Sequence, residues 1–385
     1  MTMNQVKYGC GIDIAKEKFD ACLGLFDINQ GFTKVGTKQF SNTSKGYTQY
    51  MEWVKKQCKH SLPVLHLMEA TGIYYENLAL YLYNKQESVS VILPNKAKKY
   101  KESIGLKTKT DGVDALGLSR MVCEQVLPLW QTANPKFYEL RLFTRQLESI
   151  VVQTGSVKNQ LEAVSLSMYP SKQIEKLLKQ QIKFFDKQKA ELLQTISKIV
   201  EEDELLKRKF ANILVIKGLG IQAVATIIAE TNGFELFKNI SQLVSYAGYD
   251  VIENQSGKHI GKTKISKKGN GKIRRCLHFP ALVVVRCKVK PFVQLYERVY
   301  QTSNIKMKGY TAVQKKLLVM IYTLWKKDEL FNENYQQDKI SKEDEKEFSF
   351  VSASQKQKQK KVAPVKTEAT QDKHPSKNRS MPSFV

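Results

Sequence analysis

The sequence has few of the residues from which most zinc and disulfide sites are built. Its six cysteines are scattered and no two form a Cys-x-x-Cys pair, which disfavours a zinc site or a disulfide framework and predicts reduced thiols in a cytoplasm. The five histidines form no cluster with metal-ligand spacing. We therefore expect any metal ion to be held by oxygen ligands, as Mg²⁺ and Mn²⁺ are.

Long apolar runs and acidic residues are also scarce. No run is long enough to span a bilayer, and the first apolar strand is too short for a signal peptide and carries Asp13. Lysine and arginine total 62 against 37 acids, which gives a formal net charge of +25. Such an excess predicts a polyanionic partner, with nucleic acid as the first candidate and a membrane surface as the competing one.

Strands and helices alternate in the first third of the 385-residue chain. This order is typical of an α/β layer structure, and the length allows two or three domains. The expected strands cover about residues 6–13, 19–23, 32–40, 64–68 and 89–93, and the expected helices cover 42–56 and 74–83.

Four carboxylates are candidates for a common site, and two of them belong to apolar strands, where surface acids are not expected. Asp13 lies inside the first apolar strand and Glu69 ends a later one, and a lone buried charge is costly without a partner. Asp111 and Asp114 begin a helical pattern three residues apart, so they share one helix face. In isolation this pair suits a helix start capped by Thr110.

Together the four acids predict a site for Mg²⁺ or Mn²⁺. Two such ions would clamp the attacking and leaving oxygens of a phosphodiester. The alternative is a set of unrelated surface acids, which Asp13 and Glu69 argue against because both belong to apolar strands.

The middle of the chain is helical. Apolar residues follow helical spacing from 136 to 200 and break at Pro170, which predicts an antiparallel coiled-coil hairpin with Pro170 near its tip or, alternatively, an ordinary helical bundle. Residues 213–230 contain two helices around Gly-Leu-Gly. This segment is either a helix–hairpin–helix that binds a DNA phosphate or a tight interhelix turn.

A basic segment follows, ENQSGKHIGKTKISKKGNGKIRR, in which no acid comes after Glu253. Its cations predict a cradle for a phosphate backbone. The Ser256–Gly257 pair within it is ordinary turn chemistry on sequence grounds alone. The eight cations are Lys258, Lys262, Lys264, Lys267, Lys268, Lys272, Arg274 and Arg275.

Several stretches resemble a known family in sequence and in order. They are GIDIAKEKFDACL, MEATGIYYENLALYL, VILPNKAKKYKESIGLKTKTDGVDALGLSRM and SGK…ISKKGNGKIRR, between about residues 7 and 325. The set resembles the DEDD-type insertion-sequence transposases of the IS-one-ten (IS110) family.

This resemblance implies a RuvC-like domain with a ribonuclease-H fold and a bound divalent metal, Mg²⁺ or Mn²⁺. Its metal ligands would be Asp13, Glu69, Asp111 and Asp114. It also implies that Ser256 is the nucleophile that forms a phosphoserine link to DNA, and that a structured bridge RNA from the element guides the reaction. The serine has no adjacent histidine–carboxylate pair, so we expect its activation to come from the carboxylate site through folding or a second subunit.

The resulting expectation is a DNA transposase that excises and inserts its own element. Its domains would be a RuvC-like domain (1–130), a coiled-coil hairpin (131–207), a mainly helical serine-bearing domain (208–330) and a disordered basic tail (331–385). Expected partners are the element ends, target DNA, bridge RNA and further copies in a homodimer or homotetramer, in the bacterial cytoplasm near the nucleoid. The alternatives are a metal-dependent Holliday-junction-type nuclease and a non-catalytic nucleic-acid-binding protein.

Overall fold

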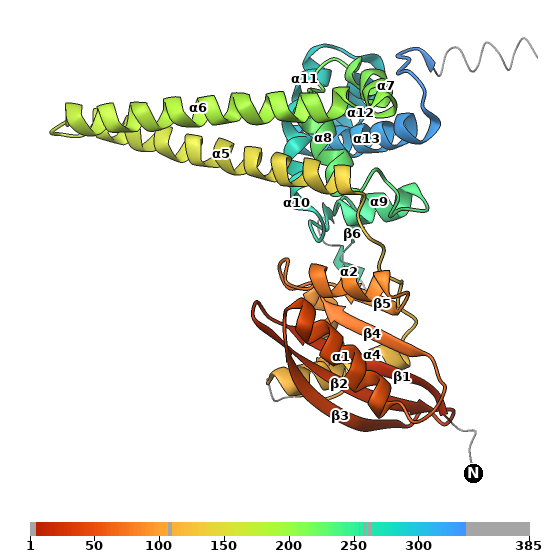
Figure 1. Cartoon of the computed structure of the whole chain (residues 1–385). Helices are drawn as coiled ribbons and strands as arrows, with labels where there is room; N and C mark the ends of the chain where they lie inside the picture. The colour runs from red at the N-terminus through yellow and green to blue at the C-terminus, as the bar shows by residue number, and fades with distance from the viewer. Residues whose placement is uncertain (1–4, 107–109, 254, 257–258, 261–262, 336–385) are drawn as a thin grey trace, which may run out of the picture. The chain divides into compact units, whose positions relative to one another are not determined.

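The computed structural model describes residues 5–106, 110–253, 255–256, 259–260 and 263–335. The chain forms two compact units, Met1–Pro135 and Lys136–Val385. The first is mixed α/β and the second is mainly helical (Figure 1). Within the described ranges no helix is long and apolar enough to cross a membrane.

The first unit is built on a five-stranded sheet with the order β3-β2-β1-β4-β5. The first three strands form antiparallel hairpins, whereas β4 runs parallel to β1 and β5 runs parallel to β4. The sequence predicted all five strands. Their bounds are Gln5–Ile14 for β1, Lys18–Asp27 for β2, Phe32–Ser41 for β3, Val64–Glu69 for β4 and Ser88–Ile92 for β5.

Helices cover the sheet and bury its two faces. Tyr8, Cys10 and Ile12 of β1 point into a core with Tyr50 of α1, whereas Leu67 of β4 belongs to a separate core shared with α4. The sequence did not predict α3, which Pro94 begins at its first turn, a position that suits proline. The helices are α1 (Ser44–Gln57), α2 (Glu76–Asn84), α3 (Pro94–Ser103) and α4 (Asp111–Glu124).

Two glycines of β1 allow α4 to pack unusually close to the sheet. A Cβ on Gly9 would lie 2.3 Å from Cys123 Sγ, and a Cβ on Gly11 would lie 2.1 Å from the backbone oxygen of Ala115. The Ser119 hydroxyl also donates a hydrogen bond of 2.7 Å to the Gly9 carbonyl. Any side chain at these two positions would push the helix away from the strand.

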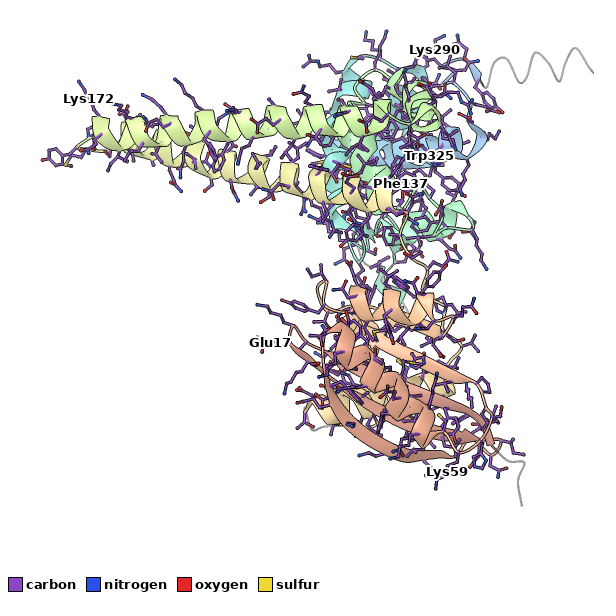
Figure 2. The ribbon with its side chains drawn as sticks, viewed as in Figure 1. Glu17, Lys59, Phe137, Lys172, Lys290 and Trp325 are labelled. Atoms are coloured by element: carbon purple, nitrogen blue, oxygen red, sulfur yellow. The ribbon has the colours of Figure 1, made fainter. Side chains whose placement is uncertain are left out.

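The second unit begins with two long helices that run antiparallel as a hairpin (Figure 1). These are α5 (Pro135–Ser165) and α6 (Lys172–Glu201), with Pro170 in the connection as predicted. Lys172 lies near the tip of the hairpin, far from Phe137 and Trp325 at its base (Figure 2).

In the described part of the second unit, seven further helices form its body around an apolar core. Trp325 belongs to this core and contacts the rings of Phe137, Phe210 and Phe234. The helices are α7 (Glu204–Leu214), α8 (Ile221–Glu230), α9 (Ile240–Tyr246), α10 (Gly271–Cys276), α11 (His278–Arg286), α12 (Lys290–Ser303) and α13 (Lys306–Lys327).

The connection between α7 and α8 contains the predicted Gly-Leu-Gly turn. Gly218 has a φ of +95°, and a Cβ there would lie 2.8 Å from Val283 Cγ1. The glycine is therefore needed both for the backbone turn and for packing against α11. Phosphate binding by this turn stays a prediction. Residues 336–385, most of the predicted tail, lie outside the described residues.

Candidate active site

Asp13 and Glu69 lie next to each other because of the strand register. Ile12 of β1 is paired with Met68 of the parallel strand β4, so the residue after each lies at the same level of the sheet. Side chains alternate along a strand, so Asp13 shares a face with Gly9 and Gly11, and that face is covered by α4.

Helix α4 brings the other two carboxylates to this edge. Asp111 and Asp114 are in its first turn, and the Thr110 hydroxyl accepts a hydrogen bond from the Val113 amide at 3.4 Å. The predicted cap is confirmed. Because α4 crosses β1 at the two glycines, its N-terminal turn reaches the carboxyl end of the strand.

The other three predicted carboxylates act electrostatically on Asp13. Burial, together with the negative charges of Asp114, Asp111 and Glu69, raises the pKa of Asp13 to about 6. Lys101 opposes this shift. The donors are all carboxylate oxygens, which are the ligands that hard divalent cations prefer, so the chemistry of the donor set, as distinct from its spacing, fits Mg²⁺ or Mn²⁺.

Lys101 of α3 is the cation already present among these acids. Its Nζ lies 2.6 Å from Asp114 Oδ1 and 3.9 Å from Glu69 Oε2. Among the described residues, no three acidic, histidine or cysteine side chains are arranged closely enough to hold a metal ion together. Two of the four acids, Asp114 and Glu69, thus share the Lys101 ammonium group.

Ser256 lies in the second unit. Its backbone belongs to β7 (Gln255–Ser256), which pairs with β8 (His259–Ile260) so that the backbone of Ser256 is in register with that of His259. A second short ladder joins β6 (Val251–Ile252) to β9 (Lys264–Ile265). The serine is thus carried by a small β segment inserted between helices α9 and α10.

The eight predicted phosphate-binding cations have different environments. Lys258 and Lys262 lie outside the described residues, whereas Lys264, Lys267 and Lys268 are exposed. The other three are engaged by the protein itself. Lys272 and Arg275 bind the two oxygens of Glu148 at 2.7 and 2.6 Å, and Arg274 donates to the carbonyls of Ala247 and Lys267.

These contacts fasten α10 to the long helix α5. Burial alone would raise the pKa of Glu148, but its hydrogen bonds with Lys272 and Arg275 outweigh burial and lower it. Glu148 therefore carries its negative charge at neutral pH. It balances the charges of Lys272 and Arg275, which the sequence analysis predicted to bind nucleic acid. Arg275 remains about two-thirds exposed and accessible to a phosphate as well.

A buried carboxylate fixes the other side of this segment. Glu230 of α8 is 2% exposed and receives hydrogen bonds from Arg145 at 2.7 and 3.0 Å and from Asn270 at 2.7 Å. Asn270 also caps α10, because its Oδ1 accepts from the amides of Lys272 and Ile273. These two amides at the start of α10 are therefore already hydrogen bonded within the protein.

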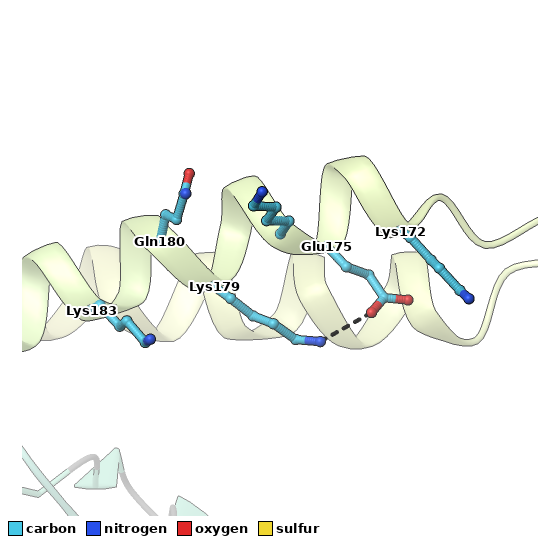
Figure 3. A pocket seen from close by; sticks show the side chains of 6 residues that line it. Lys172, Glu175, Lys179, Gln180 and Lys183 are labelled. Atoms are coloured by element: carbon cyan, nitrogen blue, oxygen red, sulfur yellow. Dashed lines mark hydrogen bonds and ion pairs between the residues drawn. The ribbon is translucent and has the colours of Figure 1, made fainter.

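A further basic surface lies on α6 near the hairpin tip (Figure 3). Its lysines recur every three or four residues and so share one face of the helix. Glu175 pairs with Lys179 at 3.1 Å, which leaves a strong positive excess. The residues of this surface, here called the α6 lysine surface, are Lys172, Glu175, Lys176, Lys179, Gln180 and Lys183.

The sequence reasoning missed the residues that assemble the carboxylate site. Gly9 and Gly11 are spaced by two, which places both on one face of β1, and this spacing could have indicated a close helix contact. Lys101 lies in a lysine-rich stretch that reads as a solvated helix face, so its position among the acids had no sequence signal.

Two family models and two relatives match the chain. A transposase model matches residues 10–170, and a model described as the transposase IS116/IS110/IS902 family matches residues 211–297. The pilin gene-inverting proteins of Moraxella bovis and Moraxella lacunata are each 27% identical over 324 residues, which cover 84% of this chain and 97% of each relative.

Among solved structures, T. thermophilus RuvC in complex with a Holliday junction substrate matches 29% of this chain and 90% of that chain. The identity is 10% and the TM-score is 0.23, a level that supports no argument about fold or function. The first family model spans the first unit and the start of the second, the other model lies within the second unit, and the two match in the order that the sequence motifs predicted. The chain therefore belongs to the IS116/IS110/IS902 family of transposases, which are DNA transposase and recombinase enzymes.

Proposed function

We propose that this transposase excises and inserts its own insertion element by cutting and rejoining DNA under the guidance of an element-encoded bridge RNA. Ser256 is the nucleophile, and Asp13, Glu69, Asp111 and Asp114 form the metal-dependent site. The observation that carries the proposal is the convergence of four carboxylates from β1, β4 and α4 at one edge of the sheet.

The sheet topology supports a ribonuclease-H-like, RuvC-like first domain. Three antiparallel strands followed by two parallel ones, in the order β3-β2-β1-β4-β5, place the first acid on the central strand. The second acid is on the adjacent parallel strand, and the last two are on a helix that covers both strands. This arrangement suits phosphodiester chemistry, because a bound divalent ion would stabilise charge that develops on the phosphate oxygens.

The covalent step balances without a further reactant. The Ser256 Oγ forms a bond to phosphorus while the phosphorus–oxygen bond to one strand end breaks, and the serine proton passes to a base and then to the departing oxygen. The link between the serine and the DNA is itself a phosphodiester, so the energy of the broken bond is conserved. A DNA hydroxyl can therefore attack this link later and release the serine. Cations of the basic segment stabilise the developing charge.

The proposed RNA partner is supported by the charge distribution. The net charge of +25 exceeds what one short DNA contact needs, and the α6 lysine surface offers a second basic region away from the Ser256 segment. A structured RNA has a dense phosphate backbone that such a surface attracts. The coiled-coil hairpin and the helix–hairpin–helix turn are proposed to contribute to nucleic-acid binding, and two-ended exchange suits a dimer or tetramer.

The relatives support strand exchange over simple hydrolysis. Their names state that they invert a pilin gene, and inversion requires that cut ends be rejoined. A metal-dependent junction nuclease needs only the carboxylate site, and a binding protein needs neither that site nor Ser256.

An adduct-trapping assay tests the proposal. Purified protein, co-expressed element RNA, Mg²⁺ and labelled DNA with the element ends are mixed and separated under denaturing conditions, and adducts are mapped by mass spectrometry. We expect an adduct at Ser256 that is absent when RNA or Mg²⁺ is omitted. Ser256→Ala removes it, whereas Ser245→Ala, an exposed serine on α9, keeps it.

The other possible results of the assay distinguish between the alternative functions. Cleaved DNA without an adduct favours the junction nuclease, and binding without cleavage favours the non-catalytic protein. An adduct that forms without added RNA removes the bridge RNA from the proposal and leaves the serine mechanism.

A further inference from the structure

Lys101 stands in a different environment from the other lysine of α3 for which the structure shows an ion pair. Its side chain is 17% exposed, and its ammonium is shared between Asp114 at 2.6 Å and Glu69 at 3.9 Å. Lys98, one turn earlier, is 74% exposed and pairs with Glu102, itself 62% exposed. Exposed pairs of that kind contribute little, whereas a partly buried ammonium between two acids is a fixed part of its site.

The aliphatic part of the Lys101 side chain packs in the space that Gly117 leaves by having no side chain. A Cβ on Gly117 would lie 2.8 Å from Lys101 Cγ and 3.1 Å from its Cδ. Gly117 is one helical turn after Asp114, so the lysine stem lies against the α4 backbone and leads to the carboxylate. The position of the ammonium is therefore set by packing as well as by charge.

The Lys101 ammonium also occupies space beside Asp114 in which a metal ion would otherwise bind. A divalent ion such as Mg²⁺ binds carboxylate oxygens at about 2.0–2.1 Å, and Asp114 Oδ1 already has a cation at 2.6 Å. Four carboxylates carry four negative charges. One ammonium and one divalent ion leave a net charge of −1, whereas one ammonium and two divalent ions give +1 before any phosphate is bound.

We propose that Lys101 takes the place of a second metal ion, so that the carboxylate site of this transposase holds one divalent ion per chain. This inference rests on the proposed function, because it needs the four acids to be a metal site. The ammonium supplies a positive charge at the acids where a second ion would otherwise stabilise a phosphate oxygen. Lys101 is thus a determinant of metal stoichiometry.

Counting bound Mn²⁺ tests the inference without measuring activity. The full chain, freed of nucleic acid, is titrated with MnCl₂, and free Mn²⁺ is measured from its electron paramagnetic resonance signal. The ions specific to the site are those lost in Asp13→Asn. We expect one in the wild type and one in Lys98→Met, the matched control on the same helix.

Removal of the ammonium is expected to admit a second ion. Lys101→Met keeps the stem that packs on Gly117 and removes the charge, and it should bind two site-specific ions with the spectrum of a spin-coupled Mn²⁺ pair. Lys101→Arg keeps the charge and should bind one. If Lys101→Met unfolds, as circular dichroism would show, Lys101→Gln serves the same purpose.

Each other result overturns the inference in a distinguishable way. Two coupled ions in the wild type exclude Lys101 as a substitute and leave the proposed metal site standing. One ion in both the wild type and the neutral variants shows that Lys101 does not set the number. No site-specific ion in any of them removes the metal site itself.

Discussion

Gly11 of β1 lies directly against Ala115 of α4, since a Cβ on Gly11 would be only 2.1 Å from the Ala115 carbonyl oxygen and 2.1 Å from the Ser119 amide nitrogen. Backbone atoms cannot move aside as a flexible side chain does. This contact is what allows the first turn of α4, with Asp111 and Asp114, to reach the strand end at Asp13.

A methyl group at this contact should separate the helix from the strand. We expect Gly11→Ala to lower the free energy of unfolding by about 1–3 kcal/mol or more, the usual range for overpacking, and to reduce DNA cleavage. The control is Gly36→Ala on β3, where a Cβ would lie at an ordinary 3.5 Å from Trp53 Cζ2. Urea unfolding measures both, and equal stabilities of the two variants would contradict the close contact.

Much of the first unit could be predicted from the sequence, because its signals are local. Short apolar runs indicated the five strands, and Thr110 ahead of two acids indicated the start of α4. Helix α3 was missed because its lysine-rich sequence shows little apolar periodicity. Only Ala97 and Tyr100 of that helix are buried.

The environment of individual charges could not be predicted, because it depends on tertiary contacts. Glu148 is 124 residues from Lys272, and no local pattern links them. The basic segment therefore reads as uniformly available for phosphate, although three of its cations are engaged by the protein. Glu69 and Lys101 likewise meet only through packing of α3 and α4 beside β4.

The ion pair of Glu230 should stabilise the second unit in a pH-dependent way. Burial opposes ionisation, but hydrogen bonds from Arg145 and Asn270 lower the pKa of Glu230. A carboxyl with a lowered folded-state pKa contributes stability above its unfolded pKa of about 4.3 and loses it as pH falls through the folded value. We expect Glu230→Gln to cost about 2 kcal/mol at pH 7.

That cost should shrink as the pH falls below the unfolded value of about 4.3 and through the lower folded-state value, because the wild-type carboxyl then becomes protonated. Thermal unfolding at several pH values measures the difference. Glu201→Gln, an exposed glutamate at the end of α6, is the control and should be near neutral throughout. A pH-independent effect of Glu230→Gln would show that the charge is not what stabilises the contact.

Asp114 should be required for metal-dependent cleavage. Its carboxylate lies in the first turn of α4 and contacts Lys101. We expect Asp114→Asn to reduce the cleavage rate by at least about 100-fold, because a neutral amide binds a hard cation poorly. Asp186→Asn, an exposed aspartate on α6, should keep the wild-type rate. An unchanged rate and Mg²⁺ requirement in Asp114→Asn would remove this residue from the site.

The α6 lysine surface should account for part of the salt dependence of nucleic-acid binding. Each phosphate contact releases counterions, so log K falls with log salt by about 0.9 for each contact. We expect the triple replacement of Lys172, Lys176 and Lys183 by glutamine to reduce the slope by about 3 on a non-specific duplex. Fluorescence anisotropy at several salt concentrations measures it.

The control for this experiment removes the same charge from another helix. Lys45, Lys55 and Lys56 of α1 are exposed, and their replacement by glutamine should leave the slope unchanged. Equal losses in the two triple variants would mean that net charge alone governs binding. A slope unaffected in the α6 variant would mean that its lysines are a solvated face, and the Ser256 segment with exposed Lys264, Lys267 and Lys268 would then carry the phosphate contacts.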